Sequence, residues 1–283
     1  MKHLPIYILI AVLLCCCTSR PKADQHTLYV SILPLRTIVG QIVGDDFEIG
    51  VLVPAGASPE TFEPTPKQFI ALNSAQLVFN VGLIDFENSL LSKIEDTTKI
   101  VNLSAGITPI AGSCSHSSHG HHHPHGIDPH IWTSARELQR MATNAYSALH
   151  VLYPDSVKYT TNYHALIAEL QRLDTKIGAA LTAGGTTYFI IYHPALTYYA
   201  RDYGIRQVAI EEEGKEPTAK RLSQVIAQAR KDGVKRIFYQ SQFPASAVAV
   251  IAKDIDADYV EIDPLREDVI ANLSEITSLI TQK

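Results

Sequence analysis

Residues 155–183 have the sequence DSVKYTTNYHALIAELQRLDTKIGAALTA, and this stretch decides the fold. Its large apolar side chains recur three or four positions apart along its length: Leu166, Leu170, Leu173, Ile177 and Leu181. This is the spacing of one face of an α-helix, and the glycine pair that follows is typical of a helix end. At about 1.5 Å per residue, the predicted helix over residues 155–184 measures roughly 40 Å, enough to run the height of two domains.

Strand-like and helix-like segments alternate on both sides of this helix. The segments predicted to be strands are 28–33, 47–53, 77–81 and 99–103 before it, and 188–192, 207–210, 236–239 and 259–262 after it. Helical spacing is found between them, for example over 66–74, 218–231, 245–253 and 266–280. No repeated segment is apparent between the two halves.

Strands that alternate with helices form parallel sheets with helices on their faces. The predicted fold class is therefore α/β, with an N-terminal lobe over residues 27–154 and a C-terminal lobe over residues 185–283. We expect each lobe to be a mostly parallel sheet with helices on both faces, and the one long linking helix over residues 155–184 to join them.

The first seventeen residues differ from the rest of the chain. A short basic start is followed by an apolar run over residues 4–17, which is shorter than the roughly 20 residues that a membrane span requires and has the proportions of a secretory signal. The run ends in three cysteines, which resembles the lipobox of bacterial lipoproteins, so Cys17 or Cys16 is predicted to carry a lipid. Residues 18–26 would then tether an extracytoplasmic, membrane-anchored protein. A simple cleaved signal with incidental cysteines is the alternative.

The composition limits the partners and the sources of stability. The formal net charge of the 283 residues is −5, which argues against nucleic acid as a partner. Beyond the leader the only cysteine is Cys114, so the mature chain cannot close an internal disulfide and must be stabilised by packing. We expect a monomer.

Residues 113–126 form a loop that is rich in Ser, Gly and His and has no apolar period. Six of the twelve histidines of the chain lie within it: His116, His119, His121, His122, His123 and His125. Such tracts bind metal, but a flexible segment offers no fixed geometry, so the loop is predicted to be an accessory metal collector. A solvated loop of biased composition is the alternative.

Four candidate metal ligands stand at strand ends or helix starts, namely Glu60, His130, His193 and Asp263. Ligands collect outside the carboxyl ends of strands in α/β sheets, and two candidates come from each half, so a shared site would lie in the cleft between the lobes. Two imidazoles and two carboxylates complete the shell of a borderline divalent metal such as zinc. Each residue alone also has an ordinary structural explanation. Because a histidine ligand must be neutral, we expect affinity to fall below about pH 6.5.

Four segments together resemble the ZnuA/TroA-like family, the cluster A-I solute-binding proteins of zinc and manganese ABC transporters. They are GASPETFEPTP at 56–66, DPHIW at 128–132, EGKEPT at 213–218 and DPL at 263–265. The resemblance implies two α/β lobes bridged by a rigid helix, one buried ion held by residues 60, 130, 193 and 263, and delivery to a membrane permease powered by a cytoplasmic ATPase. It implies that no reaction is catalysed. A histidine-rich loop before the second segment is also similar to the zinc-specific branch.

Two positions depart from the pattern of that family, which usually has His at the position of Glu60 and Glu at the position of Gln240. With Glu60 the donor set is harder and also resembles the manganese or iron branch, whereas the histidine loop favours zinc. Zinc is therefore predicted, with Mn²⁺ or Fe²⁺ as the alternative. A surface metal buffer or adhesin without a transporter is a further alternative. A metallohydrolase is disfavoured, because the chain has no His-Glu-x-x-His motif.

Overall fold

The computed structural model describes residues 27–112, 126–211, 217–243 and 245–282. The predicted signal peptide, the tether, the lipidated Cys17 or Cys16 and the six loop histidines lie outside these residues and stay predictions. Among the described residues, no helix combines the length and the hydropathy that crossing a bilayer requires.

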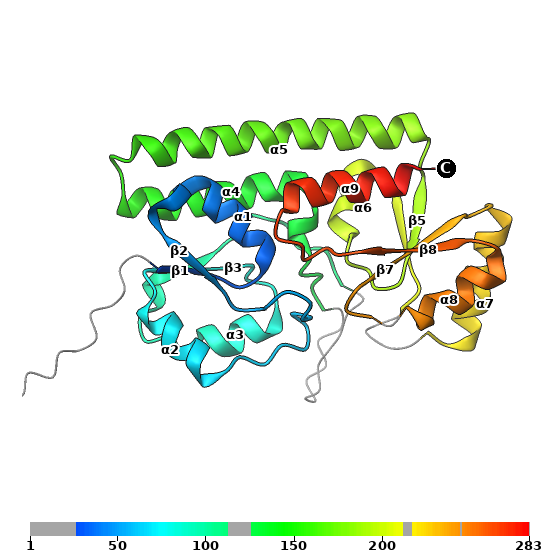
Figure 1. Cartoon of the computed structure of the whole chain (residues 1–283), viewed down its shortest axis with the longest axis horizontal. Coiled ribbons are helices and arrows are strands. Elements are labelled where there is room, and N and C mark those ends of the chain that lie inside the picture. The colour runs from blue at the N-terminus through cyan, green and yellow to red at the C-terminus, as the bar shows by residue number, and fades with distance from the viewer. Residues whose placement is uncertain (1–26, 113–125, 212–216, 244, 283) are drawn as a thin grey trace, which may run out of the picture.

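The N-terminal lobe is built on a four-stranded sheet in the order β2-β1-β3-β4, in which every neighbouring pair is parallel. Its strands are β1 (Thr27–Val30), β2 (Glu48–Val51), β3 (Leu77–Asn80) and β4 (Ile100–Asn102). Two helices cover each face: α1 (Leu33–Val43) and α4 (Ala135–Leu152) on one, α2 (Pro66–Ser74) and α3 (Asp85–Leu91) on the other (Figure 1).

The C-terminal lobe has the same plan, a parallel sheet in the order β6-β5-β7-β8. Its strands are β5 (Tyr188–Ile191), β6 (Arg206–Ala209), β7 (Arg236–Gln240) and β8 (Asp258–Ile262). One face carries α6 (Thr197–Tyr203) and α9 (Val269–Thr281), and the other carries α7 (Ala219–Lys231) and α8 (Ser246–Ile255) (Figure 1). The predicted class of two α/β lobes is confirmed.

The long helix α5 (Val157–Gly184) runs across the top of both lobes in Figure 1. The Ser156 side chain caps its first turn, and Gly185 ends it in the left-handed conformation (φ 64°) that glycine adopts without strain. Its 28 residues correspond to about 42 Å. The five apolar residues that predicted the helix are all buried, in a hydrophobic core that continues from the N-terminal sheet to α9. The two lobes therefore share one packed layer beneath α5.

Most element boundaries lie within two residues of the prediction, and two differ by three residues. The strand expected over residues 28–33 ends at Val30, and helix α1 begins at Leu33 with Pro34 in its first turn, where a missing N–H costs nothing. The helix expected from residue 266 begins at Val269, because the Asp268 carboxylate accepts the N–H of Ala271 and caps it there.

The lobes are structural duplicates, and the sequence holds a short trace of this that we did not expect. The sequence EPTPK at 63–67 matches EPTAK at 216–220. Residues 64–67 and 217–220 run into the first turns of the equivalent helices α2 and α7. Thr65 and Thr218 cap these helices in the same way, each accepting the backbone N–H three residues later. Equivalent helices (α1 and α6, α4 and α9) face α5 in both lobes. Hence the carboxyl ends of both sheets point into one cleft, below the middle of α5.

Candidate metal centre

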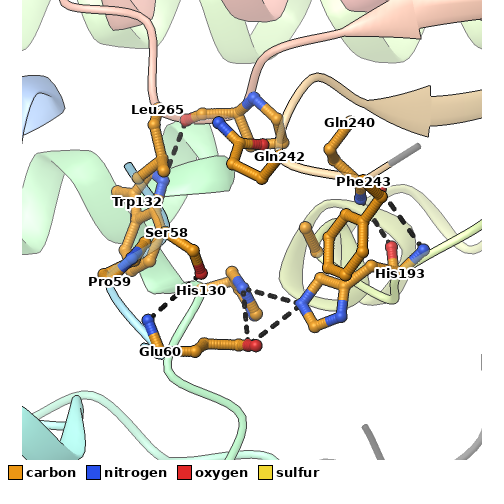
Figure 2. A pocket seen from close by; sticks show the side chains of 12 residues that line it. Ser58, Pro59, Glu60, His130, Trp132, His193, Gln240, Gln242, Phe243 and Leu265 are labelled. Carbon is orange, nitrogen blue, oxygen red and sulfur yellow. Dashed lines mark hydrogen bonds and ion pairs between the residues drawn. The ribbon is translucent and has the colours of Figure 1, made fainter. Parts of the chain in front are cut away.

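The structure brings three of the four predicted ligands together, Glu60, His130 and His193, with one donor atom of each within 4.8 Å of the others. Glu60 Oε1 lies 3.1 Å from His193 Nε2 and 3.9 Å from His130 Nε2, and the two Nε2 atoms are 3.4 Å apart (Figure 2). Two ligands of a tetrahedral zinc ion with bonds of about 2.1 Å lie about 3.4 Å from one another. The three distances lie on both sides of this value, so the three donor atoms converge closely enough to share one ion.

A local turn holds His130, which is 5% exposed and immediately precedes the 3-10 turn Ile131–Thr133. Asp128 Oδ1 lies 2.9 Å from the backbone N–H of His130 and 2.8 Å from its Nδ1. Burial would raise the pKa of Asp128, but the charge and hydrogen bonds of His130 and a bond from Thr197 lower it. An ionised carboxylate can only accept, so Nδ1 carries the proton and Nε2 offers its lone pair to the cleft.

His193 lies two residues after the end of β5, and three residues of the C-terminal lobe support it. Its Nδ1 lies 3.0 Å from Glu211 Oε2, its ring stacks on Phe243 with centroids 5.2 Å apart, and its main chain is bonded to the Gln240 side chain. Burial alone would lower the pKa of His193, but the hydrogen bonds and negative charges of Glu211 and Glu60 outweigh it and raise the pKa to about 9. In the metal-free protein both ring nitrogens of His193 are therefore protonated at neutral pH, and its side chain is positively charged.

Glu60 reaches the two imidazoles from the loop that follows β2. Its backbone N–H donates to Ser58 Oγ at 3.3 Å, and its carboxylate, 14% exposed, points between the two rings (Figure 2). The loop thus delivers a negative charge to the point where both Nε2 atoms converge.

Asp263 is not among the grouped residues. Its Oδ1 accepts the backbone N–H of Leu265 at 2.9 Å and the side-chain N–H of Gln242 at 3.4 Å, as in a turn after a strand. The next carbonyl, that of Pro264, accepts Nε1–H of Trp132 at 3.0 Å, which ties this turn to the N-terminal lobe beside His130. The role of Asp263 as a fourth ligand stays a prediction.

A cavity beside the three donor atoms leaves room for a further ligand. It is lined from both lobes by Ser58, Pro59, Trp132, Ala195, Gln240, Gln242, Phe243, Pro264 and Leu265, besides the three residues themselves. Six of the twelve residues that line it are apolar, and an environment of low polarity strengthens the attraction between a cation and Glu60.

Sequence reasoning missed the two carboxylates that orient the histidines. Asp128 stands two residues before His130, within a segment that had been noted only for its resemblance. Glu211 follows the end of β6 just as Asp263 follows β8, so the same rule of strand ends could have found it. Both are buried, with 3% and 6% exposure.

Comparison with known proteins agrees with this fold. The sequence profile of the ZnuA family, described as zinc-uptake complex component A, periplasmic, matches residues 28–277. The chain is 26% identical to the zinc-binding lipoprotein AdcA of Streptococcus pneumoniae serotype 4, over 94% of this chain and 56% of that protein. It is 29% identical to the high-affinity zinc uptake system protein ZnuA of Bacillus subtilis strain 168, over 83% of this chain and 77% of that protein.

A crystal structure of ZnuA superposes with a TM-score of 0.82 at 34% identity, covering 91% of this chain and 98% of that one. The chain spans about half the length of the streptococcal relatives that it matches, 56% in the case of AdcA. Because the profile covers most of the chain and the crystal structure shares both sequence and fold, the chain belongs to the ZnuA family.

Proposed function

We propose that this chain is the extracytoplasmic receptor of a zinc uptake system, which captures Zn²⁺ in the cleft and delivers it to a permease driven by an ATPase. The observation that carries the proposal is the convergence of Glu60 Oε1 and the Nε2 atoms of His130 and His193 at distances of 3.1, 3.4 and 3.9 Å. The names of the relatives and of the matched family support zinc as the cargo and an uptake complex as the partner. The chain would bind and release the metal without catalysing a reaction.

The spacing of the donor atoms is compatible with zinc, and the names of the relatives favour zinc over the manganese or iron alternative. Neighbouring ligands of an octahedral ion with bonds of about 2.1 Å lie about 3.0 Å apart, closer than those of a tetrahedral ion. The three donor distances here are 3.1, 3.4 and 3.9 Å, so one is close to the octahedral value and two are longer. We propose Asp263 as the fourth ligand, reached when its carboxylate turns from the N–H of Leu265 toward the cleft.

Metal content after competition tests this function. The metal-free protein would be dialysed against equal amounts of zinc, manganese and iron(II), and the bound metal measured by mass spectrometry and located by anomalous scattering. We expect one zinc ion per chain between the three side chains. Manganese or iron at that place would favour the other branch of the family. A cleft that contains no metal after the competition would contradict the proposal.

The membrane anchor and the transporter need separate tests. We propose that Cys17 or Cys16 carries a lipid. Radiolabelled palmitate should be incorporated into the wild-type protein but not into the variant in which the lipidated cysteine is replaced by alanine. Deletion of the gene should impair growth under zinc limitation, with rescue by excess zinc. Unchanged growth would favour a surface metal buffer or adhesin instead.

A further inference from the structure

Gln240 reaches the main chain of His193. It is the last residue of β7, is 2% exposed and lines the cavity. Its Nε2 donates to the carbonyl oxygen of His193 at 2.6 Å, and its Oε1 accepts the backbone N–H of His193 at 3.3 Å (Figure 2). One side-chain amide therefore satisfies both backbone polar groups of a candidate ligand.

The end of the β5–β7 ladder explains why such an amide is needed. The two strands pair up to Ile191 and Phe238, and the N–H of Tyr192 still donates to the carbonyl of Phe238 at 2.8 Å. Beyond this point the chain leaves the sheet at Pro194, so no strand pairs with the buried peptide groups of His193, although its carbonyl also accepts the backbone N–H of Ala195 at 2.8 Å. Gln240 replaces that strand, because its side-chain amide supplies a donor and an acceptor together.

Gln240 is also connected to the ring of His193. Its own carbonyl accepts the backbone N–H of Phe243 at 3.0 Å, and the Phe243 ring is stacked on the imidazole at an interplanar angle of 21°. The main chain and the ring face of His193 thus share one support, while Glu211 holds Nδ1 from another direction.

The second histidine has a different kind of support. The backbone N–H and the Nδ1 of His130 both bond to Asp128, and its carbonyl accepts the hydroxyl of Thr133 at 2.8 Å. All of these contacts lie within six consecutive residues. Placement of His130 therefore depends on its own turn, whereas placement of His193 depends on the packing of the C-terminal lobe.

We propose that Gln240 is a positioning residue for metal binding, whose amide fixes His193 so that Nε2 faces Glu60 and His130 before the ion arrives. The inference rests on the proposed function, because the ligand role of His193 belongs to it. A ligand that is held in place beforehand loses less freedom on binding, and small displacements of a metal ligand are costly.

The test uses Gln240→Met, which keeps the length of the side chain and removes both hydrogen bonds without adding a charge. Asn144→Leu is the matched control. The Asn144 amide donates to the carbonyls of Leu103 and Ala105 at 2.8 and 2.9 Å, in the other lobe and away from the cleft. Zinc affinity would be measured by competition with a chelator, the geometry by the visible absorption of the Co²⁺-loaded protein, and stability by thermal unfolding with EDTA.

We expect Gln240→Met to weaken zinc binding about tenfold, the equivalent of one lost buried hydrogen bond, and to change the Co²⁺ spectrum. Asn144→Leu should lower stability and leave both readouts unchanged. If Gln240→Met does not fold, Gln240→Asn keeps the amide but cannot reach His193, and it should show the same two effects.

Wild-type affinity with an unchanged Co²⁺ spectrum in the Gln240 variant would overturn the inference. An equal loss of affinity in the Asn144→Leu control would overturn it too. Failure of the wild-type chain to bind zinc tightly would instead refute the proposed function.

Discussion

The raised pKa of His193 predicts that zinc affinity depends steeply on pH, at pH values well above those at which an ordinary histidine titrates. The metal-free pKa of His193 is raised to about 9, because Glu211 and Glu60 outweigh its burial, whereas an unperturbed histidine titrates near 6.5. Zinc binds only the neutral imidazole, so the ion must displace this proton.

The magnitude follows from the difference between pH and pKa. At pH 7, with a pKa of about 9, roughly one metal-free molecule in a hundred has a neutral His193. The apparent affinity should therefore rise about tenfold per pH unit from pH 7 to about 8.5 and level off near pH 9. At pH 7.5 each zinc ion should release about one proton from this residue. The pH dependence expected from sequence, with its break near 6.5, is thus displaced upward.

Two measurements check this. Calorimetry of zinc binding in buffers of different ionisation enthalpy gives the number of released protons. The chain has a single tryptophan, Trp132, whose ring centroid is 5.2 Å from that of His130, so its fluorescence reports binding in chelator competition at each pH.

Glu211→Gln removes one of the groups that raise the pKa of His193, and proton release at pH 7.5 should fall in that variant. A flat affinity from pH 7 to 8.5 without proton release in the wild type would refute the reasoning.

Four further outcomes are expected. A group whose pKa is raised on folding stabilises the protein below its unfolded pKa, and this stabilisation is lost as the pH rises through the folded pKa. Because the pKa of His193 is raised to about 9, the metal-free protein should lose about 3 kcal/mol of its free energy of unfolding between pH 6.5 and 9. Urea denaturation measures this loss. His193→Ala should abolish tight zinc binding, whereas deletion of residues 113–126 should leave it nearly intact in the same titration; the opposite ranking would move the main site to the loop. Asp128→Asn should weaken zinc binding about ten- to hundredfold, because the amide no longer fixes the tautomer of His130. If Asp263 is a ligand, Asp263→Asn should weaken zinc binding as much as Asp263→Ala. If Asp263 only shapes its turn, the Asp263→Asn variant should keep the hydrogen bond to Leu265 and should bind zinc with wild-type affinity.

The fold could be predicted largely because its signals are local. The apolar period of residues 155–183 and the alternation of strands and helices each lie within a short window of sequence. The boundaries that failed were those set by one side chain, Pro34 in the first turn of α1 and Asp268 at the cap of α9. The duplication of the lobes escaped notice, because packing preserves the order of strands while the trace that we find in the sequence is five residues long, at 63–67 and 216–220.

The two histidines mark the limit of sequence reasoning at the site. The hydrogen bonds from Asp128 and Thr133 that orient His130 come from residues 128–133, so the segment that suggested the ligand also contained these two partners. The partners of His193 are 18 residues away at Glu211 and 47 residues away at Gln240, and no periodicity of the chain relates them. Only the order β6-β5-β7 brings the ends of these strands next to one another. A ligand can therefore be predicted from a strand end, but the carboxylate that sets its pKa and the amide that fixes its main chain follow from the neighbours of that strand in the sheet.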